Sequence, residues 1–137
     1  MSYHLIATLH SPLYVELPRK TKKNKRIYLN INWYRNGPYF ELNAVKKTYK
    51  EYMQKQIKTL PTLNKIACRF VLYPKTNRLC DLPNICSIHD KFFMDALVEY
   101  GIIADDNYTI HIASTSSFGS VCKNNPRVDI EIYQVKD

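Results

Sequence analysis

The sequence predicts a single α+β domain over residues 1–137, with two main helices packed on a mixed or antiparallel sheet. Its length is that of one domain and suffices to bury a core without disulfides or a structural metal. Hydrophobic residues make up 45% of the chain, as is usual for a folded globular protein. Segments with strand periodicity alternate with two segments of helical periodicity, which gives the predicted order ββαβαββ.

The N-terminal part predicts two strands joined by a basic loop. Residues 13–17 alternate between apolar and polar side chains and predict a strand. Residues 19–26 include six Lys or Arg and no apolar residue. We expect this run to be a surface loop, because burying so many like charges would be prohibitive. Residues 26–32 predict the second strand, and the Asn-Gly-Pro sequence at 36–38 predicts a turn.

Residues 43–58 predict the first helix, with Asn43 as its N-cap and Pro61 just beyond its end. Its apolar stripe at helical spacing consists of Val45, Tyr49, Tyr52, Met53 and Ile57. We expect this stripe to pack in the core.

The C-terminal part predicts a helix between strands. Residues 65–73 predict a buried strand, and residues 74–78 a turn. A second helix is predicted over 84–100, ended by Gly101 as the C′ glycine. A strand at 108–114, a flexible polar loop at 114–125 and an alternating strand at 127–135 complete the prediction.

A net charge of +8 favours a polyanionic partner, with nucleic acid ahead of an acidic membrane. A basic protein without such a partner is the plain alternative. The four cysteines show neither CxxC spacing nor a zinc pattern. The first ten residues do not resemble a signal peptide, and no apolar stretch approaches the length of a membrane span. We therefore expect a cytoplasmic protein with reduced thiols and no membrane partner.

The second predicted helix has an apolar side and a polar front. The front carries Lys91 and Asp95, an i,i+4 pair. Asp81 precedes the helix, and Asp105 and Asp106 follow it. If the next strand returns beside the strand that precedes the helix, we expect these carboxylates to meet near Lys91.

Carboxylates brought together repel one another and stay ionised only beside a cation. Mg²⁺ prefers such oxygen ligands and can activate water at a phosphate, while a neighbouring lysine stabilises the charge that develops there. The same residues are also consistent with a surface ion pair of Lys91 with Asp95, a capping Asp81, and a solvated loop at 105–106.

The motifs in this region resemble those of RusA-type Holliday-junction resolvases, small endonucleases often carried by phages. The matching segments are Arg78-Leu-Cys-Asp81-Leu-Pro-Asn84, Lys91-Phe-Phe-Met-Asp95-Ala-Leu97, Gly101 and Asp105-Asp106. The resemblance is clearest over residues 78–110 and weaker over 30–57. It implies a RusA-like fold and a homodimer that binds four-way DNA junctions. It also implies Mg²⁺-dependent cleavage of one phosphodiester in each of two strands, with Mn²⁺ as a substitute.

By motif position, the resemblance implies that Asp81 and Asp106 are metal ligands, with Asp105 beside them. Lys91 is then the base that contacts the phosphate, and Asp95 occupies a further position of the catalytic pattern. If the gene belongs to a phage, the protein acts in the host cytoplasm.

The sequence departs from the family pattern in two ways. Pro83 stands where a second metal-binding Asp is expected. The spacing from Asn84 to Lys91 is about one helical turn longer than usual, which would bring Asp90 or Ser87 near the site. An alignment without this insertion places Ile85 and Ser87 at the acidic positions. A weakly active or inactive RusA-like junction-binding protein is therefore the main alternative, and a protein-binding or inhibitory factor is the third.

Phosphate contacts would give shape-biased DNA binding that weakens steeply with salt. The basic side chains expected to make them are Arg19, Lys20, Lys22, Lys23, Lys25, Arg26, Arg35, Lys46, Lys47, Lys50 and Arg78. Trp33, Tyr34 and Tyr39 are candidates for stacking on exposed bases, with core packing the alternative for at least one of them.

Overall fold

Four strands form a mixed sheet in the spatial order β1-β6-β4-β5 in a computed structural model that describes all residues 1–137. The strands are β1 (Ser2–Pro12), β4 (Ile66–Tyr73), β5 (His111–Phe118) and β6 (Arg127–Lys136). β6 pairs antiparallel with β1 and β4, whereas β4 and β5 are parallel. This architecture confirms the predicted α+β class and the mixed sheet.

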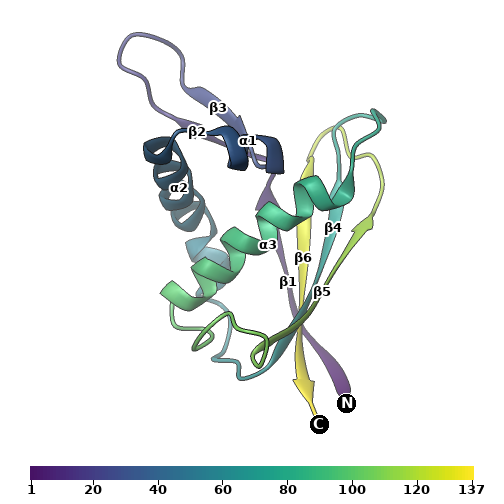
Figure 1. Cartoon of the computed structure of the whole chain (residues 1–137). Helices are drawn as coiled ribbons and strands as arrows, with labels where there is room; N and C mark the ends of the chain where they lie inside the picture. The colour runs from purple at the N-terminus through teal and green to yellow at the C-terminus, as the bar shows by residue number, and fades with distance from the viewer.

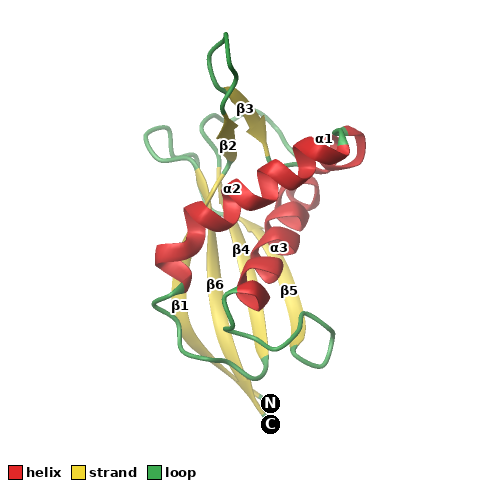
Figure 2. Cartoon of the chain, turned by 90° about the vertical axis from the view of Figure 1, so that its left-hand side faces the viewer, coloured by secondary structure: helices red, strands yellow, loops and turns green.

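The longer helices α2 (Tyr39–Ile57) and α3 (Leu82–Glu99) cover one face of this sheet, and the short α1 (Ile31–Asn36) packs against α3 (Figure 2). β2 (Tyr14–Leu17) and β3 (Lys25–Tyr28) form a separate antiparallel ribbon. The ribbon extends beyond one end of the main sheet, while both termini lie at the other end (Figure 1). No helix has the length and apolarity that crossing a bilayer requires.

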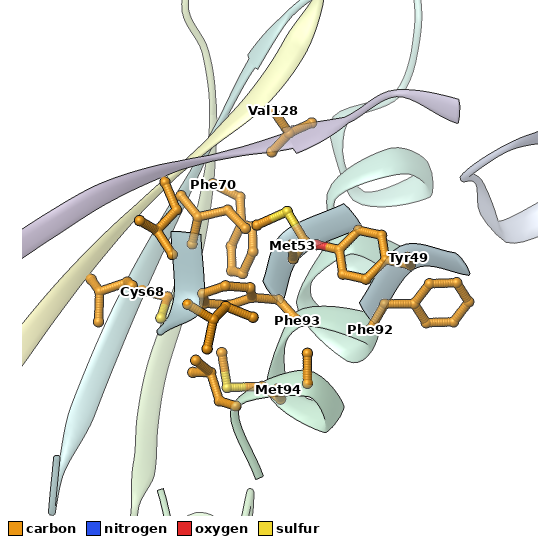
Figure 3. Close-up of a cluster of buried hydrophobic side chains, with 14 of the residues drawn as sticks. Tyr49, Met53, Cys68, Phe70, Phe92, Phe93, Met94 and Val128 are labelled. Atoms are coloured by element: carbon orange, nitrogen blue, oxygen red, sulfur yellow. The ribbon is translucent and has the colours of Figure 1, made fainter. Parts of the chain in front are cut away.

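The hydrophobic core lies between the two long helices and the sheet (Figure 3). Tyr49 and Met53 enter it from α2, and Phe92 and Phe93 from α3. β6 turns Val128, Ile130 and Ile132 inward, as its alternation predicts. Each fully buried side chain of this size contributes about 1.5–3 kcal/mol, so this layer holds α3 on the sheet.

The N-terminal strand β1 was not predicted. It pairs with β6 along almost its whole length, from Ser2 opposite Lys136 to Pro12 opposite Arg127. The register shifts between Leu5 and Ala7, where an extra residue interrupts the pairing. That irregularity breaks the two-residue alternation by which a strand is recognised in a sequence.

The predicted boundaries between 26 and 43 were also inaccurate. The strand expected over 26–32 ends at Tyr28, because Asn30 caps α1 by accepting a hydrogen bond from the Trp33 amide at 2.9 Å. Asn36 ends α1, only Gly37 and Pro38 separate the two helices, and α2 begins right after Pro38 instead of at Asn43. Tyr52, expected in the core stripe, is 58% exposed.

The C-terminal half follows the prediction more closely. β4, α3 and β6 lie within two residues of their expected bounds. Gly101 has φ +76°, the left-handed conformation that favours glycine after a helix end. β5 starts only at His111 and continues to Phe118, so the first part of the expected flexible loop, residues 114–118, is a strand. β5 is an edge strand bonded only to β4, and an exposed edge tolerates its polar Ser- and Thr-rich sequence. The observed order is βββααβαββ.

Candidate functional site

Helix α3 connects the parallel neighbours β4 and β5, and this topology separates the predicted carboxylates. Residues before and after such a crossover helix lie near its opposite ends. Asp81 occupies the N-cap of α3, about 15 Å from Lys91 along the helix axis at the usual rise per residue. Asp105 and Asp106 follow the C-terminal end of α3, in the segment that leads to β5. The structure therefore does not bring Asp81 together with Asp106.

Lys91 and Asp106, in contrast, line one pocket between α3 and the start of β5. Its lining residues are Ser87, Asp90, Lys91, Met94, Asp106 and His111. The four helical residues recur at i, i+3, i+4 and i+7, so they share one face of α3. We call this site the α3–β5 pocket. It opens to solvent.

Asp90 holds a central position in the α3–β5 pocket. The Ser114 hydroxyl donates a hydrogen bond to Asp90 Oδ2 at 2.8 Å. The other oxygen, Oδ1, faces His111 Nε2 at 3.7 Å, which is too long for a good hydrogen bond. Both of these atoms are buried, and neither has a hydrogen-bond partner. Unsatisfied buried polar atoms are rare, so this pair requires a structural or functional explanation.

The surroundings of Asp90 favour its protonated form. Burial raises the pKa of the Asp90 carboxyl, and the charge of Asp106 raises it further. His111, the hydrogen bond from Ser114 and the Lys91 charge oppose this shift. The net pKa of Asp90 lies above that of an ordinary aspartate, which makes its carboxylate a stronger proton acceptor.

Lys91 is exposed at the edge of the pocket and is available to an anion. Its Nζ lies 5.5 Å from the centroid of the Tyr34 ring, within range of a cation–π contact. The Tyr34 ring packs edge-on against Phe92 at 6.2 Å, which places α1 beside the pocket. No carboxylate lies within ion-pairing distance of Lys91. The alternative reading of Lys91 with Asp95 as an ion pair is therefore not observed, and Asp95 lies half-buried outside the pocket lining.

The two consecutive aspartates before β5 have different surroundings. Asp105 accepts hydrogen bonds from the Asp106 amide at 2.7 Å and from the Asn107 side chain at 2.9 Å. The Asn107 bond and the Asp106 amide hold the pKa of the Asp105 carboxyl below its usual range. Asp105 therefore shapes the turn, while Asp106 lines the pocket.

Asp81 lines a different hollow, which it shares with Arg78 and Asn84 near the β3–α1 connection. Pro83 lies in the first turn of α3, where a missing amide hydrogen is tolerated. The magnesium ligands expected from the resemblance, Asp81, Asp105 and Asp106, thus do not converge. No group of three or more His, Cys, Asp or Glu side chains in the chain is arranged to hold a metal ion. The predicted ligand set does not fit Mg²⁺.

The basic residues expected to contact DNA fall into two groups. Arg19, Lys20, Lys22 and Lys23 are exposed in the loop between β2 and β3, at the tip of the projecting ribbon (Figure 2). We call residues 18–24 the basic arm tip. Arg35, Lys47 and Arg78 are also exposed, and Lys46 is half-buried.

The other three basic residues have partners within the protein. Lys25 forms an ion pair with Glu41, and Lys50 lies 3.1 Å from a Glu99 oxygen. The Arg26 guanidinium lies 4.1 Å from the centroid of the Tyr14 ring and 3.4 Å from Glu16. Lys25 therefore ties the loop end of the ribbon to α2, and Arg26 makes its contacts within the ribbon.

Sequence reasoning missed His111 and Ser114 and reached Asp90 only through the one-turn insertion before Lys91. His111 belongs to no recognisable motif, and Ser114 lies at the start of the stretch predicted to be a loop. Only the pairing of β4 with β5 reveals these two residues, because it places the start of β5 beside the middle of α3. That pairing is a tertiary relationship and does not appear in local sequence patterns.

Searches for similar proteins leave the family open. No model of a known protein family matches the sequence, and no curated protein matches it. The resemblance to RusA-type resolvases therefore stays a prediction that rests on the quoted motifs.

Proposed function

We propose that the protein is a metal-dependent endodeoxyribonuclease that binds branched DNA and hydrolyses phosphodiester bonds in it. The observation that carries the proposal is the α3–β5 pocket, where a lysine, two carboxylates and an imidazole from separate segments gather on an open surface. Phosphodiester hydrolysis needs a cation for the phosphate oxygens and a base for water, and this pocket contains both kinds of group.

In the proposed reaction, the Lys91 ammonium binds a non-bridging phosphate oxygen and stabilises the charge that grows there. Asp90 accepts a proton from the attacking water, a role that its raised pKa favours. The water oxygen forms the new bond to phosphorus, the bond to one deoxyribose oxygen breaks, and solvent protonates that leaving oxygen.

DNA binding is supported by the charge and by the position of the basic arm tip. Four basic side chains are exposed there on a ribbon that extends away from the body of the protein (Figure 1). Such an arm can follow a phosphate backbone at some distance from the pocket. Cleavage of two strands at one junction requires two pockets, so the proposal includes a homodimer.

The second candidate function is junction binding without efficient cleavage. It is favoured by the position of Asp81, which lies at the far end of α3 and leaves the pocket with fewer acidic groups than the predicted cluster. Both candidates require the protein to prefer a four-way junction over a linear duplex. They differ in whether the protein then cleaves the bound junction.

A synthetic four-way junction with labelled strands tests both candidates. With Mg²⁺ or Mn²⁺, the nuclease should introduce paired nicks, and Asp106→Asn should remove them while binding persists. Asp81→Asn is the matched control, because it makes the same change outside the pocket. Tight binding without nicks under either metal would support the second candidate. Equal affinity for junction and duplex at moderate salt would refute both.

Lys91→Ala separates chemistry from docking in the same assay. We expect cleavage to fall by about 100-fold or more, the scale of a lost transition-state contact, with a small loss of junction affinity. Lys55→Ala, an exposed lysine on α2 outside the proposed interface, provides the control. An equal loss of binding and cleavage in Lys91→Ala would make Lys91 a docking residue only. Sedimentation of the free and junction-bound protein tests the homodimer.

A further inference from the structure

The hollow that Asp81 lines is a second cavity with the character of a ligand site. It lies between the base of the ribbon, the segment 74–80 and the starts of α1 and α3, at the end of the sheet from which the ribbon projects (Figure 1). Its volume is about 500 Å³, against about 260 Å³ for the α3–β5 pocket. Clefts of this size that combine apolar walls with a few polar groups are the usual form of small-ligand sites. We call this cavity the ribbon hollow.

The walls of the ribbon hollow are suited to a flat ring. Leu13 and Ile85 contribute apolar surface, and Tyr28 contributes an aromatic side chain that is 51% exposed. Tyr14 packs against Tyr28 with the ring centroids 5.3 Å apart, so the ribbon supports the Tyr28 ring from one side. An exposed and supported aromatic ring beside apolar walls is a stacking surface for a nucleobase.

The polar groups of the ribbon hollow are suited to the rest of a nucleotide. Lys75 and Arg78 are exposed in its lining, and neither forms an ion pair within the protein. Such cations bind phosphate oxygens. The exposed Asn84 amide offers both a donor and an acceptor, the groups that pair with the edge of a base. Asp81 is the only acidic residue in the lining, so the charge of the hollow favours an anion.

We propose that the ribbon hollow binds one unpaired nucleotide, with its base against Tyr28 and its phosphate beside Lys75 and Arg78. The bases of a duplex are stacked and paired, so a base enters a cavity of this kind only after it leaves the helix. The protein therefore selects DNA that has unpaired bases over a continuous duplex. The inference rests on the proposed function for its ligand, DNA, and specifies which feature of branched DNA is recognised.

One exposed face of α3 connects the ribbon hollow to the α3–β5 pocket. Asn84 lines the hollow, Ser87 and Lys91 line the pocket, and all three side chains are exposed. Their spacing at i, i+3 and i+7 places them on the same side of the helix. Asn84 and Lys91 are about 10 Å apart along the helix axis, which corresponds to about three nucleotides of one DNA strand. A single strand can therefore occupy both sites at once.

DNA binding by the full chain in the presence of a chelator tests the inference apart from any cleavage. The probes are a blunt duplex and the same duplex with a short single-stranded thymidine tail. We expect about tenfold tighter binding of the tailed duplex, the scale of one stacked base. Tyr28→Ala should remove this preference, and Tyr28→Phe should keep it. Tyr52→Ala is the matched control, because Tyr52 is a similarly exposed tyrosine, at 58%, outside the hollow. Equal affinity for both probes, or a preference that survives in Tyr28→Ala, would overturn the inference.

A second measurement avoids variants that fail to fold. A tail that contains 5-iodouracil is bound to the unaltered protein and irradiated, and the cross-linked peptide is identified by mass spectrometry. The cross-link should fall on Tyr28. Cross-links confined to the aromatic residues of α1 and the start of α2 would place the unpaired base elsewhere and refute the site.

The two proposals fail in different ways. Junction cleavage that persists in Tyr28→Ala, in a protein without preference for the tailed duplex, would refute the hollow and leave the nuclease standing. A preference for the tail that requires Tyr28, in a protein that does not cut junctions, would support the hollow and refute the nuclease.

Discussion

The Ser11 hydroxyl lies 2.6 Å from His89 Nδ1 and 2.7 Å from the Tyr49 hydroxyl, and all three side chains are fully or almost fully buried. These contacts join β1, α2 and α3 through one polar network inside the hydrophobic core. Burial lowers the pKa of His89 to about 3, because the charged imidazolium would lose its hydration without gaining a carboxylate partner. His89 is therefore neutral in the folded protein at physiological pH.

This network predicts a loss of stability in acid. In the unfolded chain His89 titrates near pH 6.5, whereas in the fold it stays neutral until about pH 3. Between these two pH values the unfolded state binds one more proton than the folded state. His89 therefore lowers the free energy of unfolding by about 1.4 kcal/mol per pH unit as the pH falls. Urea unfolding from pH 7 to pH 4 should reveal this slope. His89→Gln should flatten it, and a slope unchanged in that variant would assign it to other groups.

The ion pair of Lys25 with Glu41 predicts a structural role for a lysine that the sequence placed in the DNA interface. Glu41 is buried, and the hydrogen bond from Lys25 lowers its pKa. Lys25→Met leaves that buried carboxylate without a cation and with only the Trp33 indole as a side-chain hydrogen-bond donor, and it should destabilise the protein by about 1–3 kcal/mol. Lys23→Met, in the basic arm tip, should change stability by less than about 0.5 kcal/mol.

The pH dependence of the Lys25→Met effect provides a check on its cause. A group with a lowered pKa in the fold stabilises the protein above its unfolded pKa, and this contribution is lost as the pH falls and Glu41 is protonated. The difference between Lys25→Met and the parent protein in urea should therefore shrink as the pH falls below about 4. A difference that persists in acid would point to lost packing instead.

Local sequence patterns gave the fold class and most of the elements, because the core strands and helices have regular apolar spacing. Val128, Ile130 and Ile132 show their strand in the sequence, and Gly101 marks the end of α3. β1 was not predicted from the sequence, because its register shift near Leu5 interrupts the two-residue alternation of its side chains. Thr115 and its serine neighbours were expected in a loop because they are polar and show no apolar alternation. They form a strand because they pair with β4 at the edge of the sheet.

Part of the candidate site could be predicted from the sequence. Lys91 and Asp106, which were expected near each other, line one pocket. Asp81 was expected beside them, but the parallel pairing of β4 with β5 fixes it at the other end of α3. His111 enters the pocket only through that pairing, which no local pattern encodes.

Asp90→Asn should make the metal-free protein more stable at neutral pH. Burial opposes the charge of Asp90 more than its neighbours favour it, as the raised pKa shows. A carboxyl group whose pKa is raised in the fold loses stability as the pH rises from its unfolded pKa through its folded pKa, so removal of the charge helps most above the folded pKa and has little effect below the unfolded pKa. Urea unfolding with a chelator should show a gain for Asp90→Asn at pH 7 that disappears toward about pH 4. A loss at pH 7 would mean that His111 and Lys91 stabilise the carboxylate more than burial destabilises it.

The basic arm tip makes a quantitative prediction about DNA. Each phosphate contact that releases a counterion adds about one unit to the slope of log affinity against log salt. Replacement of Arg19, Lys20, Lys22 and Lys23 by Gln should therefore reduce the slope for junction binding by up to about 4. Arg26→Gln should change the slope little, because this guanidinium stacks on Tyr14 and lies beside Glu16. Titrations of a fluorescent junction over a range of salt concentrations measure both slopes. An unchanged slope in the fourfold variant would show that the ribbon does not touch DNA and would move the interface to Lys46 and Lys47 on α2.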